Sequence, residues 1–156
     1  MRAEAGHWRA VRTVRTEFHY PVPPGRLWTL VTSYDALARV MKGIVAFDGL
    51  PEGRVEAGQS LSVNVSLFGV LPAQPYRMDV LECDDAAMVL RSSEKGAGVK
   101  RWMHTLSVDP APGGSRLTDR IEIDAGALTP IFALWAKYLY TARHKPRLRL
   151  LESGAY

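Results

Sequence analysis

The feature that most constrains this chain is a long segment with helical periodicity, Ala127 to Leu151, which follows a run of short β-like segments. Its apolar residues recur at steps of three and four, so they lie along one side of a helix. They are Leu128, Ile131, Phe132, Trp135, Tyr138, Leu139 and Ala142. A helix of this length spans roughly 37 Å, enough to cross a curved sheet. We expect a sheet wrapped around this helix, with a hollow between them.

The length and composition predict one domain over residues 1–156. A chain of 156 residues can bury a core, and 47% hydrophobic with 23% charged residues is typical of globular proteins. The single cysteine, Cys83, excludes an intramolecular disulfide and a multi-cysteine zinc site. Met1 to His19 has no apolar signal-peptide core, and no stretch approaches the roughly 20 apolar residues of a membrane span. We therefore expect a cytoplasmic protein.

The net charge of +4 comes largely from the end of the last helix. The basic residues there are Arg143, His144, Lys145, Arg147 and Arg149. Cations at this end oppose the negative pole of the helix dipole, which is the role we expect for them. The alternative is a weak contact with a membrane surface. Aromatic residues do not alternate with these cations as single-strand binding requires, so no nucleic-acid partner is expected.

The order of predicted elements is a strand, two short helices, about six antiparallel strands and the long helix. The first strand covers Arg12 to Tyr20, and the short helices begin at Pro24 and at a cap formed by Ser33 or Asp35. The later strands are expected at 44–48, 60–67, 76–83, 88–94, 100–109 and 115–124. Pro146 should kink or end the long helix near Ala142.

This order, together with the residues of four segments, resembles the helix-grip fold of the START/Bet v 1-like (SRPBCC) superfamily. The segments are Tyr20–Trp28, Ser33–Gly43, Thr118–Ile123 and Trp135–His144. The resemblance covers roughly residues 10 to 151. It implies an α+β fold: a curved antiparallel sheet of about six or seven strands around a long C-terminal helix, with two short helices after the first strand. Members carry lipids, sterols, hormones or polyketides, and some, the polyketide cyclases and dehydrases, catalyse cyclisation or dehydration in the same cavity.

Strand alternation predicts which side chains face the hollow. On one strand these are Trp102, His104, Leu106 and Val108, and on the next Leu117, Asp119, Ile121 and Ile123. A loop over Pro110–Gly114 would set Trp102 opposite Ile121 and His104 opposite Asp119. One hairpin earlier, Leu90 would oppose His104, and Ser92 would oppose Trp102. Because an unpaired buried polar group is costly, we predict that His104 and Asp119 form a charge-assisted pair. The pair is either structural or functional.

The predicted cavity lining is mostly apolar with isolated polar points. It comprises Tyr76, Met78, Leu90, Ser92, Trp102, His104, Asp119, Ile121, Phe132, Trp135 and Tyr138. Such a lining is typical of small-molecule sites. No metal-ligand spacing or cofactor motif emerges, so neither is expected. Lys95–Gly98 is interpreted as a hairpin turn, since no helix follows it to form a phosphate loop.

Three functional hypotheses follow. The first is binding or transport of a hydrophobic or amphipathic small molecule, lipid-like or polyketide-like. The second is a cyclase or dehydratase in which His104 or Glu94 moves a proton and Asp119 orients the histidine. The third is a protein-interaction module that uses the sheet or the loop Phe68–Pro75. This loop, with the helix pair Leu27 to Met41, is also a candidate gate of the cavity. A homodimer is a further open alternative.

Overall fold

The computed structural model describes residues 11–156, so more than half of the segment Met1 to His19, expected to lack a signal peptide, lies outside the described residues. The strands are β1 (Val11–Tyr20), β2 (Val45–Asp48), β3 (Ser60–Leu67), β4 (Gln74–Asp84), β5 (Val89–Gly96), β6 (Val99–Ala111) and β7 (Gly114–Asp124). The helices are α1 (Pro24–Val31), α2 (Tyr34–Val40), the 3₁₀ turn η1 (Gly126–Leu128), α3 (Thr129–Ala142) and α4 (His144–Glu152).

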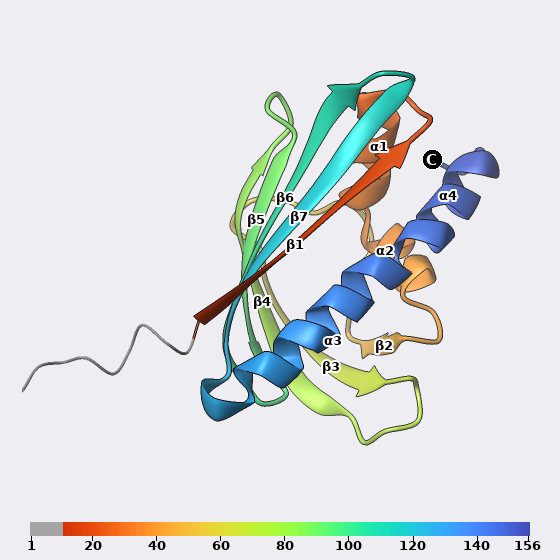
Figure 1. Ribbon diagram of the computed structural model, residues 1–156. Helices are drawn as coiled ribbons and strands as arrows, with labels where there is room; N and C mark the ends of the chain where they lie inside the picture. Colours follow the sequence, from red (N-terminus) through yellow and green to blue (C-terminus); the bar gives the residue numbers. More distant parts are fainter. Residues whose placement is uncertain (1–10) are drawn as a thin grey trace, which may run out of the picture.

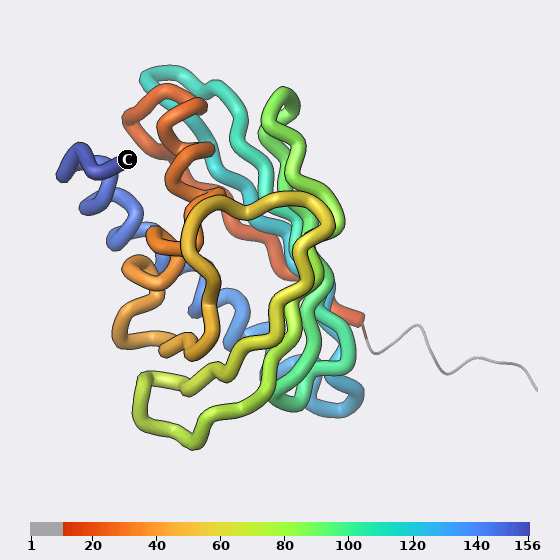
Figure 2. Tube along the Cα trace, turned by 180° about the vertical axis from the view of Figure 1, so that it is seen from behind, coloured from red at the N-terminus to blue at the C-terminus, as the bar shows by residue number. Residues whose placement is uncertain are grey.

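The strands form one antiparallel sheet in the order β1-β7-β6-β5-β4-β3-β2, which curves around α3 (Figure 1). Helices α1 and α2 cover the same concave side and contact α4. Seen from behind, the β2–β3 connection arches from the short helices across to the sheet (Figure 2). The predicted α+β helix-grip fold is confirmed.

Local sequence signals set the helix ends. Pro24 occupies the first turn of α1, where a missing N–H costs no helical hydrogen bond. The Ser33 hydroxyl caps α2 by accepting a hydrogen bond from the Ala36 N–H at 3.1 Å. The long C-terminal helix is interrupted at Arg143, so that α3 ends at Ala142 as predicted. Pro146 causes the break because it has no N–H to donate to the carbonyl of Ala142.

The predicted strand registers are wrong by two residues in both hairpins, although the faces are right. His104 lies opposite Ile121 rather than Asp119, and Trp102 lies opposite Ile123 rather than Ile121. The cause is the turn: pairing continues to Ala111 and Gly114, which leaves a two-residue hairpin loop in place of five residues.

The β5–β6 hairpin shows the same correction, since Ser92 lies opposite His104 and Leu90 opposite Leu106. Strand pairing there continues to Gly96 and Val99. A shift of two residues preserves the face of every side chain, because strand periodicity is two.

The interior contains two apolar clusters separated by a layer of buried polar residues. One cluster gathers around α1, α2 and residues such as Leu106 and Leu117, and the other around α3 with Trp102 and Ile121. Between them the sheet carries Thr16, Ser92, His104 and Asp119, which we call the polar belt. The belt therefore crosses the floor of the sheet at the level where α3 meets α4.

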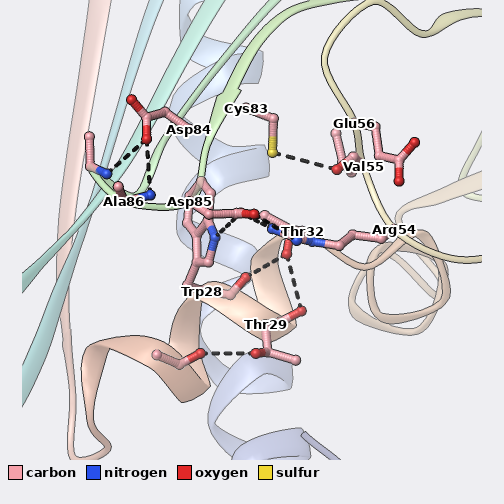
Figure 3. Close-up of polar contacts among 12 residues, drawn as sticks. Trp28, Thr29, Thr32, Arg54, Val55, Glu56, Cys83, Asp84, Asp85 and Ala86 are labelled. Atoms are coloured by element: carbon pink, nitrogen blue, oxygen red, sulfur yellow. Dashed lines mark hydrogen bonds and ion pairs between the residues drawn. The ribbon is translucent and has the colours of Figure 1, made fainter.

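A polar clamp closes the α1 end of the fold (Figure 3). The indole N–H of Trp28 donates to Asp85 at 2.8 Å, and Arg54 of the β2–β3 connection forms an ion pair with the same carboxylate. These bonds lower the pKa of Asp85 to about 2. Nearby, the Cys83 thiol donates to the carbonyl of Val55 at 3.5 Å, and burial raises the pKa of this thiol. The clamp fixes α1 and the connection to the β4–β5 turn.

Candidate ligand cavity between the sheet and the C-terminal helices

A cavity with two adjoining compartments lies between the sheet and the helices. The larger, of about 310 Å³, is enclosed by α3, β2, β3 and the β5–β6 turn. The smaller, of about 100 Å³, lies between α1 and α2 on one side and β4, β5 and β6 on the other. The compartments share the side chains Phe47, Glu94, Tyr140 and Arg143.

Most of the residues predicted to line a cavity do so. Tyr76, Trp102, Phe132 and Trp135 line the larger compartment, and Met78, Leu90, Ser92 and His104 line the smaller one. Three do not line either compartment. Asp119 and Ile121 are fully buried behind this surface, and Tyr138 is 51% exposed on the outer side of α3.

The inner face of α3 is rotated from the predicted stripe. Leu128, Ile131 and Tyr138 of the stripe are exposed, and Leu139 is buried as predicted. Ala136 and Tyr140, which the stripe did not include, are buried as well. Hydrophobicity alone does not distinguish the two sides of α3, because both are apolar. Packing against β1 and β7 selects which side turns inward.

His104 and Asp119 form a buried pair. The imidazole Nε2 and the carboxylate Oδ1 lie 2.6 Å apart, and they meet diagonally across β6 and β7. The Tyr140 ring packs on the imidazole with the ring centroids 4.9 Å apart. Burial raises the pKa of Asp119, but the hydrogen bond to His104 and the charges of His104, Arg147 and Arg143 outweigh it and lower the pKa. The carboxylate is therefore held ionised while it orients the ring.

Arg147 is a site residue that the sequence analysis missed. Its side chain is only 5% exposed, and its Nη1 lies 3.9 Å from the second oxygen of Asp119. Within residues 11–156, Arg147 Nη1, Asp119 Oδ2 and Thr16 Oγ1 are buried without a hydrogen-bond partner. At the polar belt, buried hydrogen-bond donors and acceptors therefore remain without partners among the described residues.

Arg143 is the second missed residue. It lines both compartments, and its guanidinium lies over the Tyr140 ring, 4.3 Å from the centroid. Its Nε donates to the sulfur of Met41 at 3.1 Å. Arginine stacks readily on aromatic faces, which holds this cation at the junction of the compartments.

The helix-dipole role expected for the basic helix end does not by itself account for Arg143 and Arg147, because both line the smaller compartment. Both follow Ala136 and Tyr140 at helical spacing, so they share the inward face that ends at Leu151. His144 also turns inward and stacks on Phe18. The sequence signal that indicates this inward face is the helical spacing of Tyr140, Arg143, Arg147 and Leu151. Only Lys145 and Arg149 of the basic helix end are exposed.

Glu94 carries the other charge at the junction. One carboxylate oxygen accepts a hydrogen bond from the Tyr76 hydroxyl at 2.5 Å, and the other accepts one from Ser92 at 3.0 Å. Burial, followed by the charge of Glu94, raises the pKa of Tyr76 well above its usual value. Tyr76 therefore remains a neutral hydrogen-bond donor.

The β3–β4 loop contacts Trp135, which lines the larger compartment. The Phe68 ring contacts Trp135 edge to face at 5.9 Å, while Val70 and Leu71 are exposed. The gate and interaction hypotheses for this loop stay predictions. In the described part of the chain, no three His, Cys, Asp or Glu side chains gather as a metal-binding group. No helix among residues 11–156 has the length and apolarity to cross a bilayer.

A comparison with known protein families identifies the family of this chain. Residues 19–151 match the family described as "Domain of unknown function (DUF8410)". The chain belongs to this family. No curated protein matches this DUF8410 chain.

Solved structures share the fold of this DUF8410 chain at low identity. CV1439 from Chromobacterium violaceum is 19% identical with a TM-score of 0.73, over 90% of this chain and 96% of that one. Ara h 8.0201, a Bet v 1-like protein, is 16% identical with a TM-score of 0.72, over 92% and 99%. DynU16, a protein of the dynemicin biosynthetic locus, is 17% identical with a TM-score of 0.64, over 91% and 48%. These likenesses support the predicted SRPBCC-type fold.

Proposed function

We propose that this protein binds a hydrophobic or amphipathic small molecule, lipid-like or polyketide-like, in the cavity between the sheet and the C-terminal helices. The observation that carries the proposal is the larger compartment. Its volume of about 310 Å³ lies within the range of ligand pockets, and its walls are mostly apolar. Its few polar groups, among them Tyr76, Glu94 and Arg143, converge at the inner end.

Filling this compartment tests the proposal. Leu67 lines it near the end of β3, so Leu67→Trp places an indole in the volume that a ligand would occupy. We expect the affinity for the uncharged fluorescent probe N-phenylnaphthylamine to fall about tenfold or more, because a bulky ring competes for the apolar volume. Fluorescence titration of the purified protein measures this affinity.

Leu81→Trp is the matched control, since Leu81 is 53% exposed and lines neither compartment. It should leave probe binding unchanged. If the native protein does not bind the probe, or if Leu67→Trp binds it as well as Leu81→Trp does, the proposal fails. Native mass spectrometry followed by organic extraction would identify a molecule that co-purifies.

A second candidate function is acid–base catalysis in the same cavity. It is favoured by one observation: His104 lines the smaller compartment while Asp119 orients it from behind. Glu94 borders both compartments and would be the alternative proton carrier. A histidine held in this way can transfer a proton to a ligand within reach. The fold neighbour DynU16 belongs to a biosynthetic locus, which fits a reaction of this kind.

His104→Gln separates the two functions, because glutamine can still donate a hydrogen bond to Asp119 but cannot shuttle a proton. If the protein is an enzyme, native protein and variant made in the same cells should carry different molecules, such as a pair whose masses differ by one water. Mass spectrometry of organic extracts makes the comparison. The same molecule in both proteins would contradict catalysis and leave binding in place.

A further inference from the structure

The junction of the two compartments holds Arg143, a cation without an ion-pair partner among the described residues. Among residues 11–156, no carboxylate oxygen lies within 4.0 Å of the Arg143 guanidinium. The Nε of Arg143 donates a hydrogen bond to the sulfur of Met41, and a thioether sulfur is a weak acceptor. Its terminal nitrogens are therefore free to donate, while its stem and its stacking on Tyr140 fix its position.

Arg147 adds a second cation one helical turn further on. It lines the smaller compartment, and its Nη1 is buried without a hydrogen-bond partner among the described residues. Asp119 accepts a 2.6 Å hydrogen bond from His104 with Oδ1, and the contact of Arg147 with Oδ2 is long, at 3.9 Å. Arg147 Nη1 and the terminal nitrogens of Arg143 thus have donor capacity that no acceptor among residues 11–156 takes up.

Glu94 does not remove this surplus. Both of its oxygens already accept hydrogen bonds, from Tyr76 and from Ser92, and it forms no ion pair with Arg143. The pair Glu94–Tyr76 instead borders the apolar compartment as a satisfied polar wall. A ligand that satisfies this site must therefore supply hydrogen-bond acceptors to Arg143 and Arg147. A planar carboxylate is suited to this role, because it can accept two parallel hydrogen bonds from one guanidinium.

We propose that the cavity selects an amphipathic monocarboxylate, whose carboxylate binds Arg143 at the junction beside Arg147 and whose apolar tail fills the larger compartment. This inference rests on the proposed function and specifies the chemical class of its ligand. The direction of the ligand follows from the two compartments. Ser92, His104 and Arg147 line the smaller one, whereas Phe132, Trp135 and Leu139 line the larger one.

Decanoate and decanol test the inference, because they share one alkyl chain and differ in the headgroup. Isothermal titration calorimetry at neutral pH should show that the native protein binds decanoate at least about tenfold more tightly than decanol, as expected for a charge-assisted pair. Arg143→Met keeps an unbranched stem and removes the charge. It should abolish the preference for decanoate, so that the affinities for decanoate and decanol come within about threefold of each other.

Arg149→Met is the matched control, since Arg149 carries the same charge in α4, the helix that follows Arg143, but is exposed and lines neither compartment. It should retain the preference for decanoate. Equal affinities of the native protein for both probes, or a preference that survives Arg143→Met, would overturn the carboxylate inference and leave apolar binding standing. If neither probe binds the native protein, and N-phenylnaphthylamine does not bind either, the proposed function itself fails.

Discussion

Replacing Asp119 with alanine should lower the free energy of unfolding by about 3–5 kcal/mol, the cost of leaving buried partner charges uncompensated. The carboxylate is 1% exposed and lies between His104 and Arg147. Its removal leaves the imidazole without its 2.6 Å partner and a buried guanidinium without a counter-charge. Urea denaturation followed by tryptophan fluorescence measures the change.

Asp109→Ala is the matched control, because it removes an exposed carboxylate from the same hairpin. Its effect should stay within about 0.5 kcal/mol. Combining Asp119→Ala with His104→Leu should cost less than the sum of the single changes, since both remove the same bond. A loss below about 1 kcal/mol for Asp119→Ala would show that the pair does little for stability.

The contribution of Asp119 to the free energy of unfolding should depend on pH. The folded protein lowers the pKa of Asp119 below its ordinary value of 3.8, so the contribution of this carboxylate is complete above that value. It is lost as the pH falls through the lowered pKa, because the folded state then binds the proton that the unfolded state already carries. The stability difference between the native protein and Asp119→Asn should therefore shrink as the pH falls from about 5 to about 2.

The polar pair could be predicted from the sequence because strand alternation fixes faces. His104 and Asp119 each interrupt an apolar row, and two buried polar groups on neighbouring strands must find each other. Their register could not be predicted as well, because it depends on the turn. Pro110 to Gly114 contains several turn-forming residues, and only the folded chain shows that Pro112 and Gly113 alone form the loop.

The inward position of Arg143 and Arg147 could not be predicted from the sequence, for a different reason. Arg143 and Arg147 stand in a cluster of cations at a helix end, where solvent exposure and the helix dipole explain them without any cavity. Their inward position depends on the break at Pro146 and on which side of α3 packs on the sheet. Neither follows from apolar periodicity, since α3 has apolar residues on both sides.

Replacing Gly96 with alanine should destabilise the fold by at least about 2 kcal/mol and also weaken probe binding. Gly96 has φ +125°, and an added Cβ would lie 2.4 Å from the carbonyl oxygen of Pro75 and 3.0 Å from the Cα of Tyr76. Both contacts are backbone, so β4 must move away. Because Tyr76 holds Glu94 and Gly96 lines the larger compartment, this movement opens a wall of the cavity.

Gly98→Ala provides the matched control in the same turn. Gly98 also has a positive φ, of +91°, but a Cβ there would meet only the Phe132 ring at 3.4 Å. It should therefore cost only the backbone strain, about 1–2 kcal/mol, and keep most of the affinity for N-phenylnaphthylamine. Equal losses in the two variants, in urea denaturation and in probe titration, would show that strain in the turn matters and that close packing of Gly96 on β4 does not. A larger loss for Gly96→Ala in both measurements would instead show that the close packing of Gly96 on β4 maintains the shape of the cavity.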